Sequence, residues 1–129
     1  MKPMHWLLMT LFLCLGPLSA FAQANRSVQE GFEIMTQKQL GNCVACHELP
    51  GLQASTSTFG PSLKGVGARL SRESLKQWVK DARTIQPNTL MPPFGNSDGL
   101  HKLSDKRPLL TEVQIEKVVD TLMTWQARP

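Results

Sequence analysis

Residues 41–47 read Gly-Asn-Cys-Val-Ala-Cys-His, so that two cysteines stand three positions apart and a histidine follows directly. At this spacing both thiols can form thioethers with the two vinyl groups of one haem, and the adjacent imidazole then points at the iron. We therefore predict that Cys43 and Cys46 attach a single haem c covalently. His47 is predicted to be one of the two axial ligands of its iron.

Two other uses of such a cysteine pair fit the rest of the chain less well. A zinc site needs a second pair of ligands, yet beyond residue 22 there is no further cysteine and His101 is the only other histidine. A thioredoxin-like thiol pair belongs beside a βαβ unit, and the chain shows no pattern of strands. A plain disulfide or redox-active pair remains the alternative to haem attachment.

The first 22 residues have the pattern of a secretory signal peptide. Lys2 precedes an apolar stretch at 6–18, and the small residues of Ala-Phe-Ala at 20–22 suit signal peptidase. As a membrane anchor the stretch is short against the roughly 20 residues of a spanning helix. Cys14 lies within the apolar stretch, without the small residues that precede a lipidated cysteine. We expect a signal peptide at 1–22 and one domain at 23–129.

The composition bears on the partners of the protein and on the size of its core. The net charge of +4 falls when Lys2 is removed and falls further with two haem propionates, so it indicates neither nucleic acid nor anionic membranes as partners. Aromatic residues make up 6% of the chain and tyrosine is absent. The side chains alone therefore predict a modest core, and a buried porphyrin would add the missing apolar bulk.

The first predicted helix covers about 28–40. Ser27 and Glu30 have the spacing of a capping box at its start, and Gly41 is a plausible C-cap. The apolar residues between them recur near one face of a helical wheel.

Two further helices carry clearer signals. Ser71 is predicted to cap a helix that ends before Pro87, and Thr111 with Gln114 forms a capping box ahead of a C-terminal helix. The stretches 49–67 and 86–108 are rich in glycine, proline, serine and threonine, without the alternation of strands. The predicted fold is all-α, with three to four helices and long loops wrapped around one haem.

Met91 is the predicted second axial ligand. It lies in the segment Leu-Met-Pro-Pro-Phe-Gly at 90–95, where two prolines stiffen the loop behind the sulfur. A thioether ligand favours Fe(II) relative to a second imidazole and so raises the reduction potential. The alternatives are His101 in a loop, and Met35 and Met123, which fall within helical patterns where methionine usually fills the core.

The pair Gly60 and Pro61 supplies a candidate support for His47. A metal-bound imidazole normally donates its second N–H to an acceptor, often a backbone carbonyl, and the Pro61 carbonyl is our candidate. A simple turn would use the same two residues, so this interpretation and the turn stay open as alternatives.

Four segments together resemble class I cytochromes c: CVACH at 43–47, GPSLKGVGARL at 60–70, IQPNTLMPPFG at 85–95 and TEVQIEKVVDTL at 111–122. Within that class the run at 87–95 resembles most closely the SoxX family, the monohaem subunits of SoxAX complexes. The loop at 54–58 and the segment 96–110 have no clear counterpart.

The resemblance implies a class I cytochrome c fold with one haem c. It implies the following site residues: Cys43 and Cys46 as attachment sites, His47 and Met91 as iron ligands, and Pro61 as the support of His47. It further implies that Gly31 lets the first helix cross closely over the last, near Leu122 and Trp125.

The resemblance also implies partners and a compartment. In SoxAX complexes, a SoxA subunit couples thiosulfate oxidatively to a cysteine of the SoxYZ carrier, and the SoxX subunit passes the electrons to an acceptor cytochrome in the periplasm. A SoxX-like chain would not itself be catalytic. Two other functions remain open: a free-standing carrier between redox enzymes, and a haem enzyme or gas sensor that releases Met91.

Overall fold

The computed structural model describes residues 16–52, 57, 59–98 and 107–126. Over these residues the chain forms four α-helices and two short 3-10 helices and no β-strand, which confirms the predicted all-α fold. No helix in these ranges is long and apolar enough to cross a membrane.

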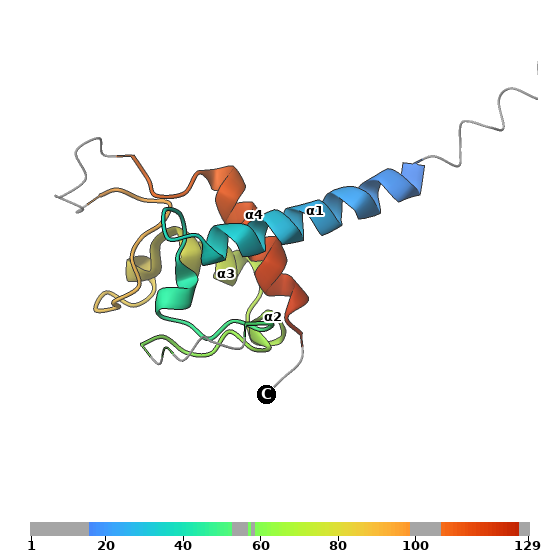
Figure 1. Cartoon of the computed structure of the whole chain (residues 1–129). Coiled ribbons are helices and arrows are strands. Elements are labelled where there is room, and N and C mark those ends of the chain that lie inside the picture. The colour runs from blue at the N-terminus through green and yellow to red at the C-terminus, as the bar shows by residue number, and fades with distance from the viewer. Residues whose placement is uncertain (1–15, 53–56, 58, 99–106, 127–129) are drawn as a thin grey trace, which may run out of the picture.

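The helices are arranged around the last of them. Helix α1 (Gly16–Thr36) crosses α4 (Glu112–Thr124), and the short α2 (Val66–Arg69) and α3 (Arg72–Asp81) also contact α4 (Figure 1). Long connections between these helices form the side of the molecule at the left of Figure 1. The helices therefore make a scaffold, and the loops are left to form a site.

Helix α1 begins earlier than the predicted helix 28–40. It runs without a break through the predicted cleavage site after Ala22, and its N-terminal part projects from the body of the molecule (Figure 1). Ser27 therefore lies inside the helix, and the predicted capping box of Ser27 and Glu30 is wrong for this chain. The Ser27 hydroxyl donates to the carboxylate of Asp120 instead, and Glu30 pairs with Lys117.

The other end of α1 lies at Thr36, before the predicted end at residue 40. The Gly41 N–H donates to the carbonyl of Ile34 at 3.0 Å, and the Asn42 N–H donates to that of Gln37 at 3.1 Å. These bonds satisfy carbonyls at the end of the helix and reverse the chain. They direct it into the segment that contains the two cysteines.

Helices α1 and α4 approach closely at Gly31. A Cβ atom built on Gly31 would lie 2.0 Å from the carbonyl oxygen of Lys117 and 2.3 Å from Oγ1 of Thr121. Only glycine allows the two backbones to come this near. The close crossing that the family resemblance implies is present, but it is centred on Lys117 and Thr121 rather than on Leu122 and Trp125.

The starts of α3 and α4 are as predicted. Ser71 Oγ accepts the N–H of Ser74 at 3.2 Å, and Thr111 and Gln114 form a full capping box, with reciprocal bonds of 3.3 and 2.8 Å. Helix α3 ends at Asp81, and a single 3-10 turn, η2 (Ala82–Thr84), follows it before the chain reaches Pro87.

Ion pairs join α3 to α4. Cations at every fourth position of α3 face carboxylates at every fourth position of α4, because this spacing keeps them on one face of each helix. We call this set the charge ladder; its members are Arg72, Lys76, Lys80, Glu112, Glu116 and Asp120. Its N–O distances run from 2.5 Å between Arg72 and Asp120 to 3.2 Å between Lys80 and Glu112.

The apolar core lies beneath these pairs. Its most deeply buried side chains are Met35, Leu49, Leu110, Ile115, Val118 and Val119. Met35 is 1% exposed, which confirms the prediction that it fills the core. Several side chains are partly buried against the same cluster, among them Cys43, Met91 and Met123. The core is therefore continuous with the predicted haem-binding residues.

Candidate haem-binding site

The two cysteines and the histidine lie on one tight turn that includes the 3-10 helix η1 (Cys43–Ala45). The amides of Cys46 and His47 both donate to the carbonyl of Cys43, at 3.1 and 2.8 Å. Asn42 enters the turn with a φ of 45°, a left-handed conformation that asparagine tolerates better than most residues. The turn thus holds two sulfurs and one imidazole within a single short segment.

The two thiols differ in their surroundings. Cys43 is partly buried against the core, and this burial raises the pKa of its thiol to about 12, whereas Cys46 is exposed. Neither cysteine is in a disulfide. A thioether carries no charge, so a thioether at Cys43 suits the apolar surroundings better than a thiolate would. The pair is therefore chemically suited to covalent attachment of a haem.

The imidazole of His47 is oriented by the loop that follows. Its Nδ1 lies 2.8 Å from the carbonyl oxygen of Pro61, the contact expected from the sequence. A carbonyl oxygen can only accept a hydrogen bond, so the proton must be on Nδ1. In the neutral imidazole, Nε2 is then the nitrogen that can coordinate a metal.

Gly60 fixes the position of the same ring from a second direction. A Cβ atom on Gly60 would lie 2.5 Å from Cε1 and 2.6 Å from Nδ1 of His47. The Gly60 N–H also donates to the carbonyl of Cys46 at 2.7 Å. The sequence shows that a glycine precedes Pro61, but only the structure reveals that its backbone lies against the imidazole.

The loop that carries Pro61 is closed at its base by Glu48. The Leu63 N–H donates to the Glu48 carbonyl at 3.0 Å, and Lys64 Nζ pairs with the Glu48 carboxylate at 2.5 Å. The hydrogen bond from Lys64 is the main reason why the pKa of Glu48 is lowered. The backbone bond and the ion pair together hold the end of the loop, at Leu63 and Lys64, beside Glu48, the residue that follows His47.

Met91 lies on the second long loop. It is partly buried and packs against the core cluster that Cys43 also contacts. Its N–H donates to Thr89 Oγ1 at 3.2 Å, and the following Pro93 and Phe94 are buried. The core thus links the predicted attachment site and the predicted second ligand, which lie on two different loops.

The alternative ligands differ from Met91 in position. Met35 is enclosed by the core, and Met123 packs on the cluster from α4. His101 lies outside the described residues, as do Cys14 and the segment 53–56. In the described part of the chain, no group of three or more His, Cys, Asp and Glu side chains could hold a metal ion. A haem would need only two ligands from the chain, such as His47 and Met91, because its porphyrin supplies the others.

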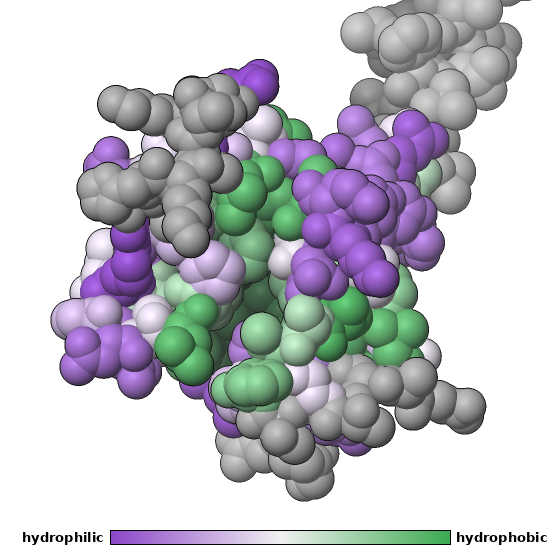
Figure 2. All heavy atoms as spheres, turned by 60° about the vertical axis from the view of Figure 1, so that its left-hand side comes forward, coloured by the Kyte–Doolittle hydropathy of each residue, from purple (hydrophilic) through white to green (hydrophobic). Residues whose placement is uncertain are grey.

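Apolar side chains surround a hollow on the side where the loops gather. Figure 2 shows this face, with hydrophobic side chains around a recess and polar side chains at the periphery. A recess of this kind is chemically suited to a porphyrin, because its faces are largely apolar.

Comparison with known proteins gives matches among solved structures. No family model matches the chain, and no curated protein sequence matches it. Four chains of solved structures do match. One belongs to the crystal structure of SoxXA from P. pantotrophus; it is 35% identical, has a TM-score of 0.70, and the match covers 77% of this chain and 81% of that chain.

Proposed function

This chain belongs to the family of SoxX-like c-type cytochromes, and from that premise we propose that it is the electron-transfer subunit of a SoxAX-type complex. In this proposal Cys43 and Cys46 attach one haem c, and His47 and Met91 are the axial ligands of its iron. The observation that carries the proposal is the extended match to a chain of SoxXA, taken with the contact between His47 and Pro61.

Different residues of the chain would attach the haem, orient its histidine ligand and set its reduction potential. The haem, when bound, supplies a reversible one-electron couple of Fe(III) and Fe(II). Thioethers at Cys43 and Cys46 would prevent its loss, and the Pro61 carbonyl accepts the proton of His47 Nδ1, so that Nε2 would be the nitrogen to bind iron. The neutral thioether of Met91 would stabilise the reduced form relative to a second imidazole and so raise the reduction potential.

Chemistry on the sulfur substrate belongs to the partner in this proposal. His47 and Met91 would both be occupied in holding the haem, and residues 23–129 contain no cysteine besides Cys43 and Cys46, so this chain would offer no group for covalent sulfur chemistry. A SoxA-like subunit would join thiosulfate to a cysteine of the SoxYZ carrier, which releases two electrons. This chain accepts them singly and passes them to an acceptor cytochrome.

We further infer that residues 1–22 are removed on export and that the protein works in the periplasm. Residues 19–26 of α1 are exposed, whereas the Ser27 hydroxyl bonds to Asp120 on α4. Cleavage after Ala22 would therefore shorten α1 without removing the contacts of Ser27 and Gly31. The N-terminal sequence of the purified periplasmic protein tests this, and a protein that begins before Gln23 would contradict it.

Covalent attachment is tested by expression together with a haem-maturation system. After denaturation and an acid-acetone wash, the protein should remain coloured and its mass should exceed that of the polypeptide by one haem. The double variant with Cys43→Ala and Cys46→Ala should be colourless after the same wash. Colourless wild-type protein without added mass would refute the proposed site.

The second ligand is tested with Met91→Ala. The wild-type ferric protein should show the weak near-infrared absorption of a thioether bound to Fe(III). The variant should lose this band and have a lower reduction potential. Met123→Ala is the matched control, because it removes a partly buried methionine that packs on the same core, and it should retain the band. A band that persists in Met91→Ala would exclude Met91.

The partner is tested by co-expression with a SoxA-like cytochrome. A stable one-to-one complex supports the proposal, whereas a protein that stays monomeric in the presence of this partner favours a free-standing carrier. Rapid binding of carbon monoxide or cyanide to the resting protein would instead favour a haem enzyme or sensor.

A further inference from the structure

The loop that carries Met91 leaves and re-enters the fold at the same place. At its start, the N–H groups of Ile85 and Gln86 donate to the carbonyl of Ala82, at 3.1 and 2.9 Å. At its end, the Gly95 N–H donates to the carbonyl of Lys80 at 2.9 Å. The end of α3 is therefore the base of the loop, and Met91 lies between two points fixed on it.

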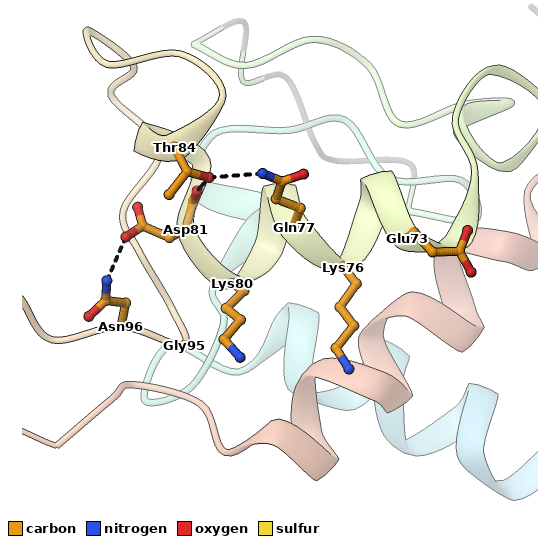
Figure 3. Close-up of a pocket in the computed structure, with 8 residues that line it drawn as sticks. All are labelled: Glu73, Lys76, Gln77, Lys80, Asp81, Thr84, Gly95 and Asn96. Atoms are coloured by element: carbon orange, nitrogen blue, oxygen red, sulfur yellow. Dashed lines mark hydrogen bonds between the residues drawn. The ribbon is translucent and has the colours of Figure 1, made fainter.

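Asp81 is the side chain at the centre of this base. It is 7% exposed, and its carboxylate accepts hydrogen bonds from Arg83 Nε at 2.8 Å and Arg83 Nη2 at 2.7 Å. It also accepts a hydrogen bond of 2.8 Å from Nδ2 of Asn96, which lies in the segment that follows the Met91 loop (Figure 3). Arg83 Nη1 in turn donates to the carbonyl of Asp98 at 2.7 Å. One carboxylate thus ties the end of α3 to the segment after Met91.

The Asp81 carboxylate caps the 3-10 turn η2, where it accepts the backbone N–H of Arg83 at 3.2 Å. Asp81 is the last residue of α3, where the helix dipole disfavours a negative charge. Despite its burial, the pKa of Asp81 is lowered to about 2, mainly by the hydrogen bonds from Arg83 and to a smaller extent by the bond from Asn96. Asp81 is therefore ionised under physiological conditions, and its bonds are charge-assisted and strong.

The loop beyond this base is stiff. Pro87, Pro92 and Pro93 have fixed φ angles, and Pro93 and Phe94 are buried. A stiff loop moves most readily as a unit about its base. Displacement of Met91 from an iron would therefore require the contacts at the base to loosen.

We propose that Asp81 is a positioning residue for the Met91 ligand, which it holds in place by fastening the base of the loop through Arg83 and Asn96. The inference rests on the proposed function, because it takes Met91 as an axial ligand. Asp81 itself does not touch the haem. It sets the equilibrium between a closed loop, with the thioether on the iron, and an open loop that exposes the iron to other ligands.

The test measures displacement of Met91 by added imidazole at neutral pH, followed by loss of the near-infrared band of the ferric protein. The apparent affinity for imidazole is the intrinsic affinity multiplied by the fraction of open protein. Loss of hydrogen bonds to a charged group should raise the open fraction about tenfold or more, so Asp81→Asn should lose the band at a correspondingly lower imidazole concentration.

A second variant keeps the proposal testable if Asp81→Asn does not fold. Asn96→Asp preserves the oxygen that accepts the Asp98 N–H at 2.9 Å, but it replaces the donor to Asp81 with a like charge. It should also increase the apparent affinity for imidazole. Glu73→Gln is the control: it removes one negative charge from an exposed position of the same helix (Figure 3) and should behave as wild type.

The outcomes separate the two proposals. If wild-type protein shows the near-infrared band but both variants bind imidazole with wild-type affinity, Asp81 does not position Met91 and the ligand assignment stands. If the wild-type band is absent, the assignment of Met91 fails and this inference fails with it. An affinity raised in Asp81→Asn and Asn96→Asp, but not in Glu73→Gln, supports the proposal.

Discussion

The backbone of Gly60 lies against the imidazole of His47, so closely that a Cβ atom there would come within 2.5 Å of Cε1. Gly60→Ala should therefore push the ring away and weaken its bond to the Pro61 carbonyl. We expect a holoprotein with an altered absorption spectrum and a free energy of unfolding lowered by about 1–3 kcal/mol, the usual cost of overpacking. Absorption spectra and urea unfolding of wild type and variant measure the two effects.

Gly51→Ala is the matched control for this substitution. Gly51 has a φ of 85°, and a Cβ atom there would meet nothing within 4 Å. The control should lose about 1–2 kcal/mol through backbone strain alone and leave the spectrum unchanged. A normal spectrum in Gly60→Ala would show that the ring does not depend on Gly60.

The crossing of α1 and α4 predicts a larger effect at Gly31. In Gly31→Ala, the new methyl group meets backbone at Lys117 rather than a mobile side-chain end, so the helices must separate. We expect a loss of about 2–3 kcal/mol in urea unfolding. Gln29→Ala, at an exposed position of the same helix, should change stability by less than about 0.5 kcal/mol. Equal losses in both variants would contradict the tight crossing.

The charge ladder should contribute little per pair. The Arg72 and Asp120 side chains are 42% and 28% exposed, so solvent screens their attraction despite the short distance. A double-mutant cycle with Arg72→Met and Asp120→Asn should give a coupling energy of about 0.5–1 kcal/mol at low salt. The coupling should shrink at about 1 M salt, where the Debye length is about 3 Å. Coupling that does not respond to salt would contradict the screening.

Asp81 should make stability depend on pH in acid. Because its pKa is lowered from 3.8 to about 2, the ionised form is favoured in the folded protein. Its contribution is complete above the ordinary pKa and is lost as pH falls through the folded value. The contribution is on the order of 2 kcal/mol. Urea unfolding between about pH 5 and 2 should show a shallower decline in Asp81→Asn than in wild type, and parallel declines would contradict this.

Local signals in the sequence predicted some elements closely. Ser71 and Thr111 start their helices as expected, because a cap depends on residues three positions apart and not on the rest of the fold. The contact of His47 with Pro61 also agrees with the sequence-based expectation, because a metal-binding imidazole needs an acceptor for its second N–H and the loop at Gly60 and Pro61 supplies a carbonyl. The haem-binding role of these residues stays a prediction.

Other features depend on contacts between distant segments. Ser27 has the pattern of a helix cap, but the helix continues past it and its hydroxyl bonds to Asp120 on α4. The four-residue spacing of the ladder is visible in each helix separately, yet nothing in the sequence shows that the two helices face each other. The ring contact of Gly60 escaped prediction for the same reason.

The helix that contacts α1, α2 and α3 is α4, the last of the four along the chain. During synthesis, the earlier helices therefore lack the element that they chiefly pack against until residues 112–124 have been made. A helix without such a partner is marginal in water. The order of translation should thus keep the polypeptide extended until late. If the chain is exported and carries a haem as proposed, that state would suit passage through a secretion channel and would leave both thiols accessible to an attachment enzyme.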